Sequence, residues 1–191
     1  MKLKKLLASV VAIAMVFSAM GTAVFAEAAA DTVPVEVSTF DELLTALEGD
    51  ATTIIMKNNI TGEATLSNAY GKTGINIKNG ETLDGNGFAL TIKGADGTWD
   101  SAISTTGGII KNLTINSGFR GVFVNHNSTY SELVVLENVT IDGPDGPVYT
   151  ISCDQGMNQG LRAINSTFNG WTSYAATIGN VEFINCNIRL S

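Results

Sequence analysis

The sequence is poor in the residues on which many catalytic sites depend. Its 191 residues include one histidine, two cysteines and three prolines, and 15% of the residues are charged. Cys153 and Cys186 are too few for a disulfide scaffold, and whether they pair after export stays open. Both lie in strand-like segments, which favours small buried apolar side chains over a nucleophile paired with His126.

Lysine and arginine are also scarce. The chain carries a net charge of −7, which argues against nucleic acid or an anionic membrane as a partner. The sequence contains no glycine-rich phosphate loop, no zinc-ligand spacing and no serine–histidine–aspartate signature. These absences argue against the enzyme classes that those three motifs mark.

The single long hydrophobic run stands at the N-terminus. Lys2, Lys4 and Lys5 precede an apolar stretch over residues 6–20, and the segment VFA ends at Ala26 with small residues where a signal peptidase cuts. The pattern predicts a signal peptide over residues 1–26, followed by a leader over 27–37. The mature protein is then expected to be secreted or held at the cell surface, with no membrane contact after cleavage.

One amphipathic helix is predicted. Residues 39–48 place Phe40, Leu43, Leu44 and Leu47 on one face. Ser38 with Asp41, or Thr39 with Glu42, resembles a capping box, and Gly49 suits the end of the helix. The remainder of the chain reads as short β segments separated by glycine, asparagine, aspartate and proline.

The β segments repeat around asparagine. The pattern of apolar, any, Asn, apolar, polar, apolar recurs at Asn112, Asn138, Asn165 and Asn185, at intervals of 20 to 27 residues, and residues 87–92 fit it with Ala89 in place of asparagine. A β repeat of this length indicates a solenoid. Each repeat contains three strands with one tight corner, and asparagine accepts the left-handed backbone of such a corner. The sequence therefore predicts a three-sided parallel β-helix whose stacked asparagines form a hydrogen-bonded ladder.

These features resemble the right-handed parallel β-helix family of pectate-lyase-like secreted bacterial proteins. The resemblance rests on the helical segment TFDELLTAL, the bend TLDGNGFALTI and the asparagine repeat. It implies an all-β solenoid over residues 38–191, with an N-terminal capping helix and about five coils. The acidic Ca²⁺ ligands, Arg-Pro pattern and polygalacturonase motifs of catalytic relatives are absent, so the fold carries little information about activity.

The resemblance also places a substrate groove along the first strand of each coil. Trp99, Phe119 and Trp171 stand just ahead of these strands, where stacked coils would align them for contact with sugar rings. Tyr149 and Tyr174 belong to the same predicted surface. The alternative is that these aromatic residues shield the coil edges from water.

Three residues form a candidate catalytic group. His126 and Asp154 follow equivalent strands of adjacent coils, so they would form an acid/base pair, and Arg120 would bind the carboxylate of an acidic sugar. The alternative is that each is a solvated loop residue. Asp84, Asp142 and Asp145 are oxygen donors suited to Ca²⁺, but Asp-Gly is also a common turn sequence. No other cofactor is expected.

The last segment, EFINCNIRLS, ends within the repeat. An uncapped coil exposes strand edges, so we expect either further coils or a second domain or subunit at that end. The leading hypothesis is a secreted or surface module that binds polysaccharide. A polysaccharide lyase or glycoside hydrolase acting on acidic glycans such as pectin is the first alternative, and a structural spacer without a ligand is the second.

Overall fold

The computed structural model describes residues 33–68, 70–97, 99–125, 133–142, 149–153, 160–174 and 181–189. The chain divides into residues 1–31 and residues 32–191, and the second unit contains all of the described part. The predicted signal peptide lies outside the described residues. Within those residues, no helix has the length and apolar character needed to cross a membrane.

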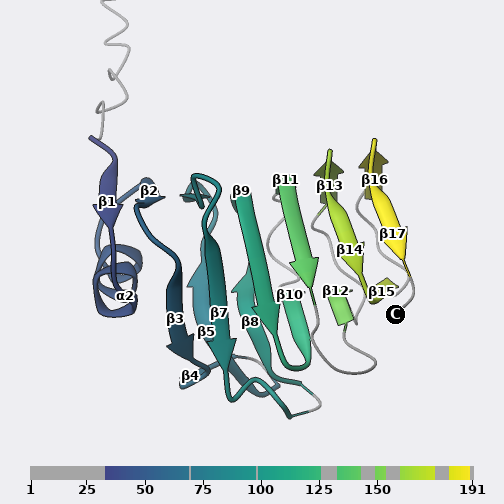
Figure 1. The fold of residues 1–191 in the computed structure, drawn as a ribbon, viewed down its shortest axis with the longest axis horizontal. Coiled ribbons are helices and arrows are strands. Elements are labelled where there is room, and N and C mark those ends of the chain that lie inside the picture. The colour runs from purple at the N-terminus through teal and green to yellow at the C-terminus, as the bar shows by residue number, and fades with distance from the viewer. Residues whose placement is uncertain are drawn as a thin grey trace, which may run out of the picture. The chain divides into compact units, whose positions relative to one another are not determined.

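The described strands form two sheets (Figure 1). One row of sheet A contains β1 (Val35–Val37), β2 (Thr53–Met56), β6 (Thr82–Asp84), β9 (Gly108–Ser117), β11 (Leu133–Asp142), β13 (Gly160–Ile164) and β16 (Val181–Ile184). A second row contains β3 (Ile60–Glu63), β7 (Ala89–Lys93), the second halves of β9 and β11, β14 (Thr167–Asn169) and β17 (Asn187–Arg189). Sheet B contains β4 (Leu66–Ser67), β5 (Lys72–Ile77), β8 (Ser101–Thr105), β10 (Arg120–Val124), β12 (Tyr149–Cys153) and β15 (Trp171–Tyr174).

Three rows of strands make a parallel β-solenoid of about four turns, against the five coils predicted. Every described pairing is parallel except that of β4 with β5. Strand β1 pairs with β2, so the solenoid begins within the segment that the sequence assigned to a leader. That segment offers only the three strand residues Val-Glu-Val, too short a run to stand out as a strand.

The inner columns of the solenoid form its core. On the first row of sheet A, register aligns five side chains that are fully buried: Ile54, Leu83, Ile110, Leu136 and Ala163. Burying such aliphatic side chains on every turn contributes roughly 1.5–3 kcal/mol for each of the larger ones. The periodic apolar pattern therefore holds the turns in register.

The predicted helix is α2 (Phe40–Glu48), which packs onto the first turn with Leu43, Ala46 and Leu47 buried. Thr39 is its N-cap, and the Thr39 side chain and the Glu42 carboxylate form the capping box. The alternative cap at Ser38 is not used in that way, although the Ser38 backbone N–H also donates to Glu42, over 2.7 Å.

The four repeated asparagines stand at equivalent corners of successive turns. Their φ angles lie between 50° and 54°, the left-handed region that asparagine tolerates better than other residues with a Cβ. Their side chains bond along the column: Asn138 Nδ2 donates to Asn112 Oδ1 over 3.0 Å, and Asn185 Nδ2 donates to Asn165 Oδ1 over 3.4 Å. The column of hydrogen bonds extends to the preceding turn, because Asn112 Nδ2 donates to the Asp84 carboxylate over 3.0 Å.

The earlier turn differs from the alignment made on the sequence. Ala89 lies in strand β7 and pairs with Thr114 of β9, so Ala89 does not occupy the corner position. The corner is instead the three-residue bend from Gly85 to Gly87, with Asn86 at φ 52°. Because this bend is longer than the single-asparagine corners, an alignment without gaps misplaces it by several residues.

The contacts of Asp84 lead to a prediction about acid stability. Burial raises the pKa of the Asp84 carboxyl, whereas hydrogen bonds from the Asn112 side chain and the Asn86 backbone lower it. The Lys111 ammonium lies 3.4 Å from this carboxylate, and the pKa of Asp84 is therefore lower than usual. A lowered folded-state pKa stabilises the protein above the unfolded-state pKa of about 3.9. That stabilisation is lost as the pH falls through the folded-state value.

We therefore expect Asp84→Asn to reduce the acid sensitivity of the fold. The wild type should lose more stability than the variant when the pH falls from about 6 to about 3. Urea midpoints measured across this range test the prediction. Parallel curves for the two proteins would show that the ionised Asp84 contributes nothing to the folded state.

Candidate functional site

Aromatic side chains gather along sheet B. Trp99 stands two residues before β8, Phe119 directly precedes β10, and Tyr149 and Trp171 begin β12 and β15. Register pairs Tyr149 with Arg120 on one side and with Trp171 on the other. The stacking of turns thus brings together residues that are tens of positions apart in the sequence.

Ring contacts form two groups, and the Arg120 guanidinium joins them into one set, which we call the aromatic row: Tyr70, Trp99, Phe119, Phe123, Tyr149 and Trp171. The Tyr149 ring centroid lies 5.8 Å from that of Phe119 and 5.9 Å from that of Trp171. At the other end, Tyr70 lies 5.8 Å from Trp99. Such tilted and edge-to-face pairs fix the ring orientations and stabilise each other by about 0.5–1.5 kcal/mol.

Three members of the aromatic row are open to solvent. Tyr70 is 40% exposed, Trp99 is 43% exposed and Trp171 is 47% exposed. Phe119 and Tyr149 are partly buried between them. A row of half-exposed aromatic faces that are held by their neighbours can receive a flat apolar ligand surface without rearranging.

Arg120 occupies the centre of the row. Its guanidinium carbon lies 4.6 Å from the Trp99 ring centroid and 5.0 Å from that of Tyr149, and Nη1 donates to the Ser152 hydroxyl. It also lies 5.7 Å from the rings of Phe119 and Phe123. The residue is 3% exposed. Arg120 therefore connects three successive turns, because its contacts come from the loop before β8, from β10 and from β12.

Two members of the row were not identified from the sequence. Tyr70 precedes β5 much as Trp99 precedes β8, and this position was the available signal. Phe123 lies inside β10, not ahead of the strand as the predicted aromatic residues do. It is 2% exposed and packs against the Tyr70 ring at 5.8 Å and against Arg120, outside the main core cluster.

Several predicted site residues cannot be placed. His126, Asp154 and Asp145 lie outside the described residues, and of Tyr174 only the strand position is described. The acid/base pair and its proximity to Arg120 therefore remain predictions. Asp142 is described, and its carboxylate accepts a hydrogen bond of 2.7 Å from Asn169 Nδ2.

Metal-binding residues do not cluster in the described part of the chain. No group of three histidine, cysteine, aspartate or glutamate side chains there is arranged to hold a metal ion. Asp84, another candidate ligand, bonds to Asn112 and lies beside Lys111. Calcium binding through Asp142 and Asp145 stays a prediction, since the second of these residues is not described.

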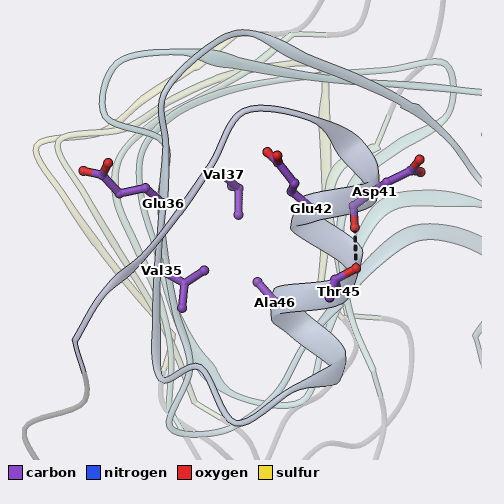
Figure 2. Close-up of a pocket in the computed structure, with 7 residues that line it drawn as sticks. All are labelled: Val35, Glu36, Val37, Asp41, Glu42, Thr45 and Ala46. Atoms are coloured by element: carbon purple, nitrogen blue, oxygen red, sulfur yellow. Dashed lines mark hydrogen bonds between the residues drawn. The ribbon is translucent and has the colours of Figure 1, made fainter.

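A pocket of about 410 Å³ lies away from the aromatic row, between β1 and α2 (Figure 2). Val35, Val37 and Ala46 supply its apolar lining. Its acidic groups are largely engaged: Glu42 caps the helix, and Glu36 pairs with Lys57 at 2.9 Å. We therefore place the candidate site on the aromatic row, where exposed rings and hydrogen-bonding groups converge.

Comparison with known proteins agrees with the architecture. Residues 34–178 match a protein-family model described as "Putative pectate lyase-like adhesive domain". No curated protein and no solved structure matches the chain. The matched region includes the helix, the corner asparagines up to Asn165 and all of the aromatic row. The chain belongs to the pectate lyase-like adhesive domain family.

Proposed function

We propose that this protein is a secreted or cell-surface adhesive module that binds polysaccharide along the aromatic row of sheet B. The single observation that carries the proposal is the exposure of Tyr70, Trp99 and Trp171 along one row of rings that Arg120 joins. Sugar rings present apolar C–H faces, and aromatic faces of this kind bind them while polar groups nearby bond to the hydroxyls.

The spacing of the row favours a polymer over a single sugar. Strands β8, β10, β12 and β15 are successive neighbours in sheet B. Because stacked strands are about 4.8 Å apart, Trp99 and Trp171 are separated by three rungs, or roughly 14 Å. A ligand that contacts both indoles must therefore contain several linked sugar units.

Polar groups beside the row suit the hydroxyls of a sugar. Register aligns Asn76, Ser104, Phe123, Ser152 and Ser173 across sheet B. Asn76 and Ser173, toward the two ends of this column, are partly exposed. These neutral donors and acceptors would fix the position of a chain that the rings hold by stacking.

Lyase or hydrolase activity is the competing function. It would need Arg120, His126 and Asp154 to act on one glycosidic linkage. Arg120 is covered by aromatic rings, which leaves it poorly placed to reach a substrate directly. Binding without turnover is therefore the function that the described geometry supports best.

Intrinsic fluorescence tests the proposal, because the only two tryptophans of the chain, Trp99 and Trp171, both belong to the row. A polysaccharide that binds there should change the tryptophan emission in a saturable way. The same mixtures, with and without Ca²⁺, should show no growth of the absorbance of unsaturated lyase products and no new reducing ends. Binding without any emission change would contradict the proposed surface, and turnover would favour the enzyme.

A further inference from the structure

Few cationic side chains belong to the described strands that carry the aromatic row. The strands of sheet B contain two cationic side chains, Lys72 in β5 and Arg120 in β10. A surface that binds uronic acids or other anionic sugars needs accessible cations that reach the carboxylates. Where these two residues lie relative to the rings therefore bears on which class of glycan the row can bind.

Arg120 is not accessible in this way. It is 3% exposed, its guanidinium carbon lies within 5.0 Å of the Trp99 and Tyr149 ring centroids, and it donates to the Ser152 hydroxyl. A carboxylate could reach the guanidinium only if these rings moved apart. The same rings are the ones that a sugar would contact, so binding through Arg120 and stacking on the row exclude each other.

Lys72 is exposed but lies at one end of the row, where an acidic group accepts a hydrogen bond from its backbone. The Asp100 carboxylate accepts the Lys72 backbone N–H over 2.7 Å, and it also accepts the Gly97 N–H over 3.1 Å. Asp100 directly follows Trp99 in the chain. The negative charge of Asp100 therefore lies at the Lys72 backbone, one residue after Trp99 in the chain, and the chain as a whole carries a net charge of −7, which repels an anionic polymer.

We infer that the aromatic row selects neutral polysaccharides over anionic ones, and that Arg120 is a positioning residue that holds the rings in place. This inference rests on the proposed function and specifies its ligand class. It differs from the sequence-based expectation that Arg120 binds the carboxylate of an acidic sugar. The buried cation fixes rings from three successive turns, and neutral stacking and hydrogen bonding then supply the recognition.

An array of immobilised polysaccharides tests the selectivity. We expect the full mature chain to be retained by neutral members such as galactan, mannan or cellulose, and to pass over polygalacturonate and hyaluronan. Retention should be nearly independent of salt, because screening weakens contacts between charges as the Debye length falls from about 10 Å at 0.1 M to about 3 Å at 1 M ionic strength.

The outcomes separate the two proposals. The anionic polysaccharides could retain the protein as well as the neutral ones or better, with retention that falls as salt rises. That result would overturn this inference but leave polysaccharide binding intact. Retention on neither class overturns the proposed function together with the inference. These measurements use the unaltered protein, so they hold even where a variant fails to fold.

Substitutions test the role assigned to Arg120. Arg120→Met keeps most of the side-chain volume without the charge or the hydrogen bond to Ser152. We expect it to change the near-ultraviolet circular dichroism of the tryptophans and to weaken neutral-glycan binding at least tenfold, while unfolding stays cooperative. Lys72→Gln, the matched loss of an exposed cation from the same sheet, should leave binding unchanged. Unaltered binding and dichroism in Arg120→Met would contradict the positioning role.

Discussion

Asn138→Val is expected to lower the free energy of unfolding by about 2–4 kcal/mol. Asn138 has a φ of 54°, and its side chain donates to Asn112 over 3.0 Å. The left-handed backbone costs a residue with a Cβ roughly 1–2 kcal/mol, and a β-branched residue more. Loss of the ladder hydrogen bond adds about 0.5–1.5 kcal/mol.

Two further substitutions at the same position separate these causes. Asn138→Gly removes the ladder bond but accepts the left-handed backbone, so its cost should be near that of one hydrogen bond, about 0.5–1.5 kcal/mol. Asn138→Ala should cost more than Asn138→Gly. Equilibrium denaturation with urea measures all three.

Asn116 provides a matched control within β9. Its side chain donates to Thr91 Oγ1 over 3.1 Å, but it is not among the residues with positive φ. Asn116→Val therefore loses one comparable hydrogen bond in a strand, where valine is favoured. If Asn116→Val proves as costly as Asn138→Val, the left-handed corner is not the source of the asparagine requirement.

The second large effect is expected in binding. Replacing both Trp99 and Trp171 with alanine should weaken polysaccharide binding by at least about tenfold, because buried tryptophans commonly contribute about 2 kcal/mol or more to an interface and 1.4 kcal/mol is a factor of ten. Both side chains are nearly half exposed, so the variant should remain folded. Affinity electrophoresis through gels that contain the neutral polysaccharide measures the change.

A control variant removes apolar side chains from a different face. Ile109 in β9 and Leu133 in β11 are 37% and 38% exposed and line a common pocket on sheet A. Ile109→Ala with Leu133→Ala also reduces the exposed apolar surface but leaves the aromatic row intact. Mobility like that of the wild type is expected from this control. Equal losses in the two double variants would indicate nonspecific apolar adsorption instead of recognition by the row.

The sequence predicted the fold well because its strongest signals are local. An asparagine inside an apolar strand pattern indicates a left-handed corner, and its recurrence at Asn112, Asn138, Asn165 and Asn185 indicates stacked turns. The prediction was wrong at Ala89, because the neighbouring turn uses a longer bend around Asn86. Two glycines flank that asparagine and were the available sign of a different corner.

The candidate site was predictable only in part. The positions of Trp99 and Phe119 ahead of their strands follow from the repeat, whereas Trp171, predicted to stand ahead of its strand, is the first residue of β15. The structure brings all three into one row. The burial of Arg120 does not follow from the repeat, because it depends on how rings from neighbouring turns pack over one side chain. Such packing depends on side-chain orientation, which a pattern of residue types does not specify.

A crystal structure with an oligosaccharide of the tightest-binding neutral polysaccharide tests the central claim most directly. We predict sugar rings stacked on the exposed faces of Trp99 and Trp171, with the chain running across successive turns of sheet B and Arg120 still covered by its rings. A sugar bound between β1 and α2, or on the outer face of sheet A with both indoles uncovered, would contradict the account.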